Sequence, residues 1–146
     1  MMAKVLFKSA GFNPDFNALM RAVDLTGQKV LVIVVGGSSK GLGAAGIKLD
    51  DEMARAKDII KAAENKKMKV LVMHIGGEGR RGAMTDAFIT TVTPAGDAVL
   101  IVNGGNKDGI FTKNLKKGVK LESAANINSL KPLVKTVLTS WGIKEQ

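Results

Sequence analysis

The sequence contains no cysteine and no tyrosine, and it has a single histidine and a single tryptophan. Without cysteine the chain has no disulfide, no thiolate nucleophile and no sulfur ligand for a metal ion. A single histidine also excludes a site built from several histidines, so we expect no bound metal. Because aromatic side chains form the stacking platforms for single-stranded nucleic acid, their scarcity argues against a nucleic-acid partner.

Long apolar segments are also missing. The apolar runs are of strand length, so no membrane span is predicted. Met1-Met2-Ala3-Lys4 leads directly into a strand-like segment, without the pattern of a secretory signal peptide. As written, the sequence predicts a cytoplasmic protein. A leader removed ahead of Met1 would instead make the protein an exported one.

Strand and helix patterns alternate along the 146 residues, which have the length of one domain, 1–146. The strand-like segments are 4–9, 29–35, 69–75, 98–102 and 119–121. Most of them are continuous Val/Ile/Leu runs, which is typical of a parallel sheet covered on both faces. The sequence therefore predicts an α/β fold. We expect a three-layer α/β/α sandwich with a five-stranded, mainly parallel sheet, like flavodoxin or a small Rossmann domain.

Two glycine-rich segments follow two of these strands. Residues 36–46 follow the strand 29–35, and residues 76–82 follow the strand that ends near His74. Ligands of open α/β sheets bind at the carboxyl ends of the strands. Glycines let a ligand approach bare backbone N–H groups closely. The two segments therefore predict a binding site.

The side chains expected at this site carry more positive than negative charge. This favours a phosphate or carboxylate ligand, held by loop N–H groups and by a guanidinium group. The predicted ligand-binding residues are Ser9, Gly37, Ser38, Ser39, Lys40, Gly41, His74, Gly76, Gly77, Arg80, Arg81 and Asn103.

Known nucleotide motifs fit the first glycine-rich segment poorly. Residues 41–46 match the dinucleotide pattern by letter, but residues 47–49 separate them from the helix expected to begin at Asp50 or Asp51. Lys40 precedes Gly41, so the phosphate-binding pattern of P-loop proteins fails. Short-chain dehydrogenases need a catalytic tyrosine that this chain lacks. These motifs therefore assign no cofactor to the chain.

His74 has two interpretations. It is either a general base beside Glu78 and Asp86, or a strand-end histidine hydrogen-bonded to a loop carbonyl. An enzyme, a hydrolase or transferase, would use His74 as base and Arg80 to stabilise charge, and Ser38 or Ser39 would be a nucleophile or would bind the substrate. The leading hypothesis is binding of a small anion without turnover. A third possibility is an interaction module that forms a homo-oligomer.

The formal net charge of +9 also has two interpretations. The lysines are either scattered over helix surfaces and strand ends, or they attract nucleic acid or acidic membranes. No run of five like charges appears, which favours the scattered arrangement.

Three blocks of the sequence, 8–11, 39–47 and 74–83, resemble an uncharacterised bacterial family, a domain of unknown function. Asp86 and the segment 97–111 fit as well, so the resemblance covers nearly the whole chain. Many members look like exported proteins with a leader. The resemblance implies that the loops at the strand ends form the functional surface. It implies no particular activity. Phe12 stands where members often have glutamine, which argues against a polar role at that position.

Overall fold

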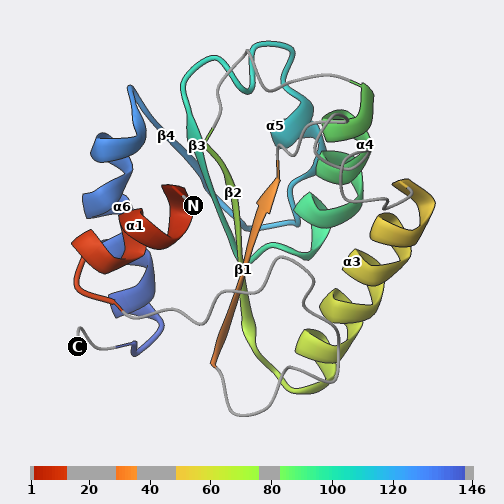
Figure 1. Ribbon diagram of the computed structural model, residues 1–146, viewed down its shortest axis with the longest axis horizontal. Coiled ribbons are helices and arrows are strands. Elements are labelled where there is room, and N and C mark those ends of the chain that lie inside the picture. Colours follow the sequence, from red (N-terminus) through yellow and green to blue (C-terminus); the bar gives the residue numbers. More distant parts are fainter. Residues whose placement is uncertain (1, 13–28, 36–48, 76–82, 144–146) are drawn as a thin grey trace.

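A computed structural model describes residues 2–12, 29–35, 49–75 and 83–143 of the protein. Its centre is a parallel sheet with the strand order β1-β2-β3-β4 (Figure 1). The strands are β1 (Val30–Val35), β2 (Lys69–His74), β3 (Ala98–Val102) and β4 (Leu121–Ala124). Each strand thus pairs with the next one along the chain.

The connections between the strands are helical, as parallel pairing requires. The helices are α1 (Met2–Ser9), α3 (Leu49–Asn65), α4 (Ala83–Val92), α5 (Ile110–Asn114) and α6 (Ile127–Ser140), with a 3-10 turn η3 (Thr93–Ala95) after α4. Crossovers between parallel strands are almost always right-handed. Because the strand order never reverses, α3, α4 and α5 fall on one face of the sheet, and α1 and α6 cover the other (Figure 1).

The face under α3, α4 and α5 is closed by one apolar cluster. Alternate strand residues such as Val70, Val72 and Val99 point into it. Ile59 of α3, Ile89 of α4 and Phe111 of α5 supply the helical side. The remaining buried members are Leu31, Val35, Ile60, Ala63, Met68, Val92 and Ile101.

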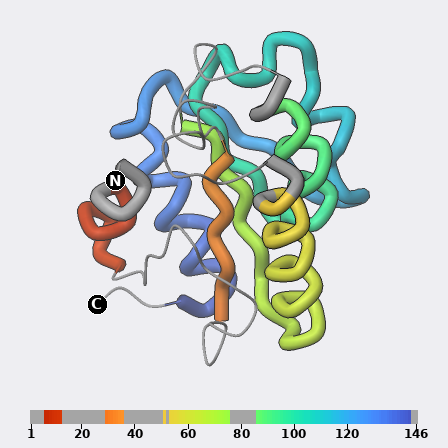
Figure 2. Tube along the Cα trace, turned by 45° about the vertical axis from the view of Figure 1, so that its right-hand side comes forward, coloured from red at the N-terminus to blue at the C-terminus, as the bar shows by residue number. Residues whose placement is uncertain are grey.

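The opposite face has a second cluster, formed with α1 and α6. Leu71, Met73 and Leu100 are the strand residues that alternate with those of the first cluster. Leu6, Phe7, Ala10, Phe12, Ala124, Leu130, Val134 and Leu138 complete it. Two views of the chain place α1 beside α6 (Figures 1 and 2). Since both faces are covered, each central strand is apolar on both sides, which explains the continuous Val/Ile/Leu runs.

The first predicted strand, residues 4–9, is wrong: this segment is the helix α1. A short apolar run fits a strand and a buried helix equally well, so periodicity could not separate them. The helical signal lies just beyond the run. Gly11 adopts a left-handed φ of 97°. The Gly11 N–H donates to the Lys8 carbonyl, and the Phe12 N–H donates to the Phe7 carbonyl. This is the Schellman motif that ends helices at glycine.

Four strands are therefore present in the described part of the chain, instead of the five expected. The α/β class and the parallel pairing are confirmed. The last strand spans Leu121–Ala124, whereas 119–121 was predicted. The helix predicted to begin at Asn13 and Pro14 lies outside the described residues. In the described part of the chain, no helix is both long enough and apolar enough to cross a lipid bilayer.

Asp97 ties the start of β3 to the start of β2. Its N–H donates to the Val70 carbonyl at 2.7 Å, and its Oδ2 accepts the Val70 N–H at 2.8 Å. The other carboxylate oxygen lies 3.1 Å from the Lys116 ammonium group. Asp97 therefore has a structural role at this edge of the sheet.

Thr93, at the start of η3, is fully buried, and its hydroxyl has no hydrogen-bond partner among the described residues. A buried hydroxyl without a partner costs about 1–3 kcal/mol. We therefore expect the nearly isosteric change Thr93→Val to raise the free energy of unfolding by about 1 kcal/mol. Urea denaturation measures this difference. Thr93→Ser is the control: it keeps the hydroxyl and loses a methyl group, and it should destabilise. Destabilisation by Thr93→Val would contradict the prediction.

Candidate functional site

The carboxyl ends of the strands lie in register at one edge of the sheet. Val35 is the Cα partner of His74, and His74 is the partner of Ile101. On the far side, Val102 is the partner of Ala124. The segments that begin at residues 36, 75, 103 and 125 therefore leave the sheet from neighbouring strands. Adjacent strands lie about 4.8 Å apart, so the last residues of these strands lie close together.

Most of the predicted ligand-binding residues lie outside the described residues. These are Gly37, Ser38, Ser39, Lys40, Gly41, Gly76, Gly77, Arg80 and Arg81. The described ones are Ser9, His74 and Asn103. The structure describes the carboxyl ends of β1 and β2, which precede the two glycine-rich segments in the chain.

Ser9 does not follow a strand. It is the last residue of α1, and its hydroxyl donates to the Leu6 carbonyl of the same helix at 2.9 Å. The reason for grouping Ser9 with the strand-end loops is therefore gone. The Ser9-Ala10-Gly11-Phe12 block instead ends a helix, and Phe12 is buried in the core beneath it.

His74 is the last residue of β2, and its side chain is 0% exposed. In the register of the sheet it stands between Val35 and Ile101, so it points to the face covered by α3, α4 and α5. The centre of the imidazole ring lies 5.7 Å from that of the Phe111 ring, tilted by 48°. Tilted aromatic pairs at this distance are favourable. The ring is thus part of the packed interior beneath the edge.

Gly105 lies directly against this ring. A Cβ added at Gly105 would stand 2.7 Å from His74 Nδ1 and 3.2 Å from Cε1. Real Cβ atoms do not approach so closely, so the imidazole occupies the space that a side chain at position 105 would need. The sequence analysis missed this glycine. Its signal is the Gly104-Gly105 pair that follows β3.

The turn between β3 and α5 uses most of its polar groups internally. Asn106 Oδ1 accepts the Phe111 N–H at 2.8 Å, and its Nδ2 donates to the Thr112 hydroxyl at 3.0 Å. Asp108 Oδ1 accepts the Ile110 N–H at 3.3 Å. These contacts satisfy N–H groups at the start of α5, where Gly109 offers no side chain. Asn106 and Asp108 therefore shape the turn.

Asn103 continues the pairing of β3 with β4. Its N–H donates to the Ala124 carbonyl at 2.8 Å, and its side chain is exposed at the edge. The backbone of Asn103 is therefore held in place by the sheet, and its side-chain amide is exposed to solvent. Sequence reasoning placed this residue at a strand end, and the structure confirms that position.

Two kinds of cofactor site can be examined in the described residues. Helix α3 begins at Leu49, so two residues separate Gly46 from the helix, whereas dinucleotide sites open the helix with their glycines. Histidine and carboxylate side chains form no group of three that could hold a metal ion in the described part of the chain. Neither observation assigns a cofactor.

Comparison with known proteins identifies one family. The model of the family described as "Domain of unknown function (DUF6305)" matches residues 1–138. No curated protein and no solved structure matches the chain.

Proposed function

The chain belongs to the DUF6305 family, a domain of unknown function, and from its own residues we propose that it binds a small anion at the carboxyl edge of the sheet. The ligand would carry a phosphate or a carboxylate group. One observation carries the proposal: Val35 and His74, the last residues of β1 and β2, are partners in the sheet. The ends of the two strands that precede the glycine-rich segments therefore lie side by side.

Backbone N–H groups of these segments would surround the anion, and Lys40, Arg80 and Arg81 would supply positive charge. Residues 36–43 and 76–79 are the parts proposed to approach it. Asn103 would add a side-chain amide from the neighbouring strand, because its backbone is fixed by pairing with β4.

Binding is proposed in preference to catalysis because of the burial of His74. A general base must come within hydrogen-bond distance of its substrate. The His74 side chain is 0% exposed and lies against Phe111 and Gly105. We assign it the role of holding the ends of β2 and the turn after β3 in place beneath the site.

We also propose that the layers form a three-layer α/β/α sandwich related to the flavodoxin or Rossmann folds. The apolar clusters on both faces of the sheet support the layering. The anion site does not depend on this relationship. It needs parallel strands whose ends are in register, and it does not need the reversal of strand order at which those folds bind their ligands.

A thermal-shift screen tests the proposal with inorganic phosphate, nucleotides, flavins and small carboxylic acids as probes. A ligand that binds the native state alone raises its stability by about 2.7 kcal/mol at a concentration of a hundred times Kd. We expect at least one probe to raise Tm. Lys40→Ala and Arg80→Ala should each weaken that probe by about tenfold or more, since each removes a hydrogen bond to a charged group.

The matched control is Lys131→Ala, which removes an exposed lysine from α6. If Lys131→Ala abolishes the probe's Tm shift as strongly as Lys40→Ala does, the probe binds through nonspecific charge attraction. That result would contradict the proposal. A screen in which no probe raises Tm would also contradict it. If no probe raises Tm and the molecular mass in solution increases with protein concentration, the hypothesis of an interaction module is favoured.

A further inference from the structure

Lysines gather at the edge of the sheet opposite the candidate site. Because all four strands are parallel, their amino ends share this edge. Lysines stand at the starts of β1, β2 and β4, in the turn between α3 and β2, and in the segment that leads from α5 to β4. All of their side chains are exposed. We call this set the lysine row: Lys29, Lys66, Lys67, Lys69, Lys116, Lys117 and Lys120.

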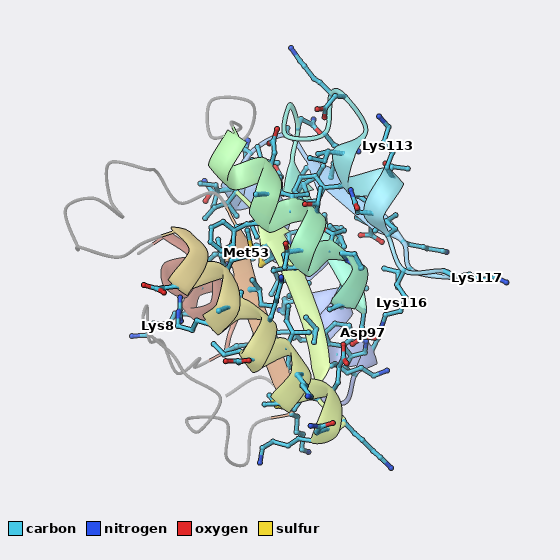
Figure 3. The ribbon with its side chains drawn as sticks, turned by 90° about the vertical axis from the view of Figure 1, so that its right-hand side faces the viewer. Lys8, Met53, Asp97, Lys113, Lys116 and Lys117 are labelled. Atoms are coloured by element: carbon cyan, nitrogen blue, oxygen red, sulfur yellow. The ribbon has the colours of Figure 1, made fainter. Side chains whose placement is uncertain are left out.

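Hydrogen bonds and one ion pair join the segments that carry the row across the sheet. The Lys69 N–H donates to the Lys29 carbonyl at 3.0 Å, which joins β2 to β1. Asp97 binds the backbone of Val70, and it also binds the Lys116 ammonium group, as Figure 3 illustrates. Three strand spacings make the row about 14 Å long. Adjacent strands are about 4.8 Å apart, which is less than the Debye length of about 10 Å at 0.1 M salt, so the fields of lysines on neighbouring strands add.

Few negative charges oppose the row. The carboxylates at position 29 and in the segments 64–70, 97 and 115–121 are Glu64 and Asp97, against seven lysines. Both oxygens of Asp97 are engaged, one by the Val70 N–H and one by Lys116. Among the described residues, this edge therefore carries a net positive charge.

One lysine of the row occupies a position that suits glycine. Lys67 has a φ of 57°, and it is the only non-glycine residue with positive φ in the described part of the chain. Its N–H donates to Glu64, and the Met68 N–H donates to Ala63, which is the Schellman ending of α3. The left-handed conformation is unfavourable for lysine, so the fold alone would favour glycine here. Lysine at this position thus keeps a positive charge at the amino edge of the sheet in spite of an unfavourable backbone conformation.

We propose that the lysine row docks the protein on the surface of an anionic phospholipid bilayer. Clusters of four to eight lysines are typical of such surfaces, and they act through charge alone. The segments of the row contain no arginine and no aromatic residue. Sites that read nucleic-acid bases use arginine forks and stacked aromatic rings, so the composition argues against base recognition and favours binding through charge alone.

Vesicle co-sedimentation of the whole chain tests the docking. The probes are vesicles of pure phosphatidylcholine and vesicles of equal parts phosphatidylcholine and phosphatidylglycerol. We expect binding to the second kind alone, with a steep loss as salt increases. Each lysine near such a surface contributes a factor of about five in affinity, so the triple variant Lys66→Gln, Lys67→Gln and Lys69→Gln should bind about a hundredfold more weakly.

The matched control removes the same charge elsewhere, with Lys57→Gln, Lys113→Gln and Lys131→Gln. These lysines are exposed on α3, α5 and α6, and Figure 3 places Lys113 away from Lys116 and Lys117. The control variant should bind nearly as well as the unchanged protein. Equal losses in the two triple variants, or equal binding to both kinds of vesicle, would overturn the proposal.

The variant Lys67→Gly separates the effect of the Lys67 charge on vesicle binding from its effect on stability. It should raise Tm by about 3 °C, because glycine adopts the left-handed conformation without strain. The same change should weaken binding to the anionic vesicles about fivefold. Unchanged binding by this more stable variant would exclude Lys67 from the surface and overturn the assignment of the row.

Nucleic acid is the alternative partner, and a mixed-sequence DNA duplex in the same buffer decides between them. We expect weaker binding to the duplex than to the anionic vesicles. Tighter binding to the duplex, lost in the Lys66/Lys67/Lys69 variant, would overturn the lipid assignment. The row is independent of the anion site proposed above, since Lys40 and Arg80 belong to segments that leave the opposite edge.

Discussion

Leu130→Ala is expected to lower the free energy of unfolding by about 3 kcal/mol, within the range seen for buried leucines. Leu130 is 0% exposed and lies in the cluster that joins α6 to Leu71 and Leu100 of the sheet. Truncation removes its contacts and leaves a cavity that the sheet cannot close, because the strands are held by neighbours on both sides. Chemical denaturation, followed by the fluorescence of the single tryptophan, Trp141, would measure the loss.

Thr139→Ala provides the control for this change. Thr139 is exposed on the same helix, so its substitution should alter stability by less than about 0.5 kcal/mol. Hydrogen exchange adds a second readout, because α1 packs beside α6 in the same cluster. Amides of α1 should exchange faster in the Leu130 variant. Equal effects of the two substitutions would show that α6 does not close this face of the sheet.

Gly105→Ala should destabilise the protein by about 2 kcal/mol, the size of effect seen when a packed core is overfilled. The new Cβ would stand 2.7 Å from Nδ1 of His74, and that ring cannot swing away because Phe111 and the sheet enclose it. The backbone of Gly105 has no positive φ, so the cost would come from the steric contact and not from strain in the turn.

A double-mutant cycle with His74→Ala checks this explanation. The single change His74→Ala removes a fully buried ring and should itself destabilise. In that background the Cβ at position 105 meets free space, so Gly105→Ala should cost almost nothing. The expected coupling energy is about 2 kcal/mol. Additive effects of the two changes would contradict the contact between Gly105 and His74.

The central strands and long helices of this fold were predictable because each carries its own signal. β1, β2 and β3 are unbroken apolar runs, and the sheet buries both of their faces. Helix α6 begins where Asn126 accepts the Ser129 N–H, and asparagine is among the residues preferred at such caps. These elements depend on residues that are close to one another in the sequence, and a hydrophobic or capping pattern reports on such residues.

Segments whose structure depends on distant partners were predicted less well. Residues 2–9 are apolar enough for a strand, and they form a helix because α6 offers them a surface. β4 contains the exposed Glu122 and Ser123, and its extent is set by pairing with β3 and not by hydrophobicity. The two interpretations of His74 could not be separated either, because its burial depends on Gly105 and Phe111, which come much later in the chain.

The uninterrupted order of the strands has a consequence for synthesis on the ribosome. Each of β2, β3 and β4 can join the sheet as it emerges, and its crossover helix covers the first face at once. On the second face, of the described helices, α1 precedes the strands and α6 follows all four of them. The apolar cluster around Leu71, Met73 and Leu100 is therefore completed only when α6 is made. Helix α1, although it is synthesised first, gains its partner last.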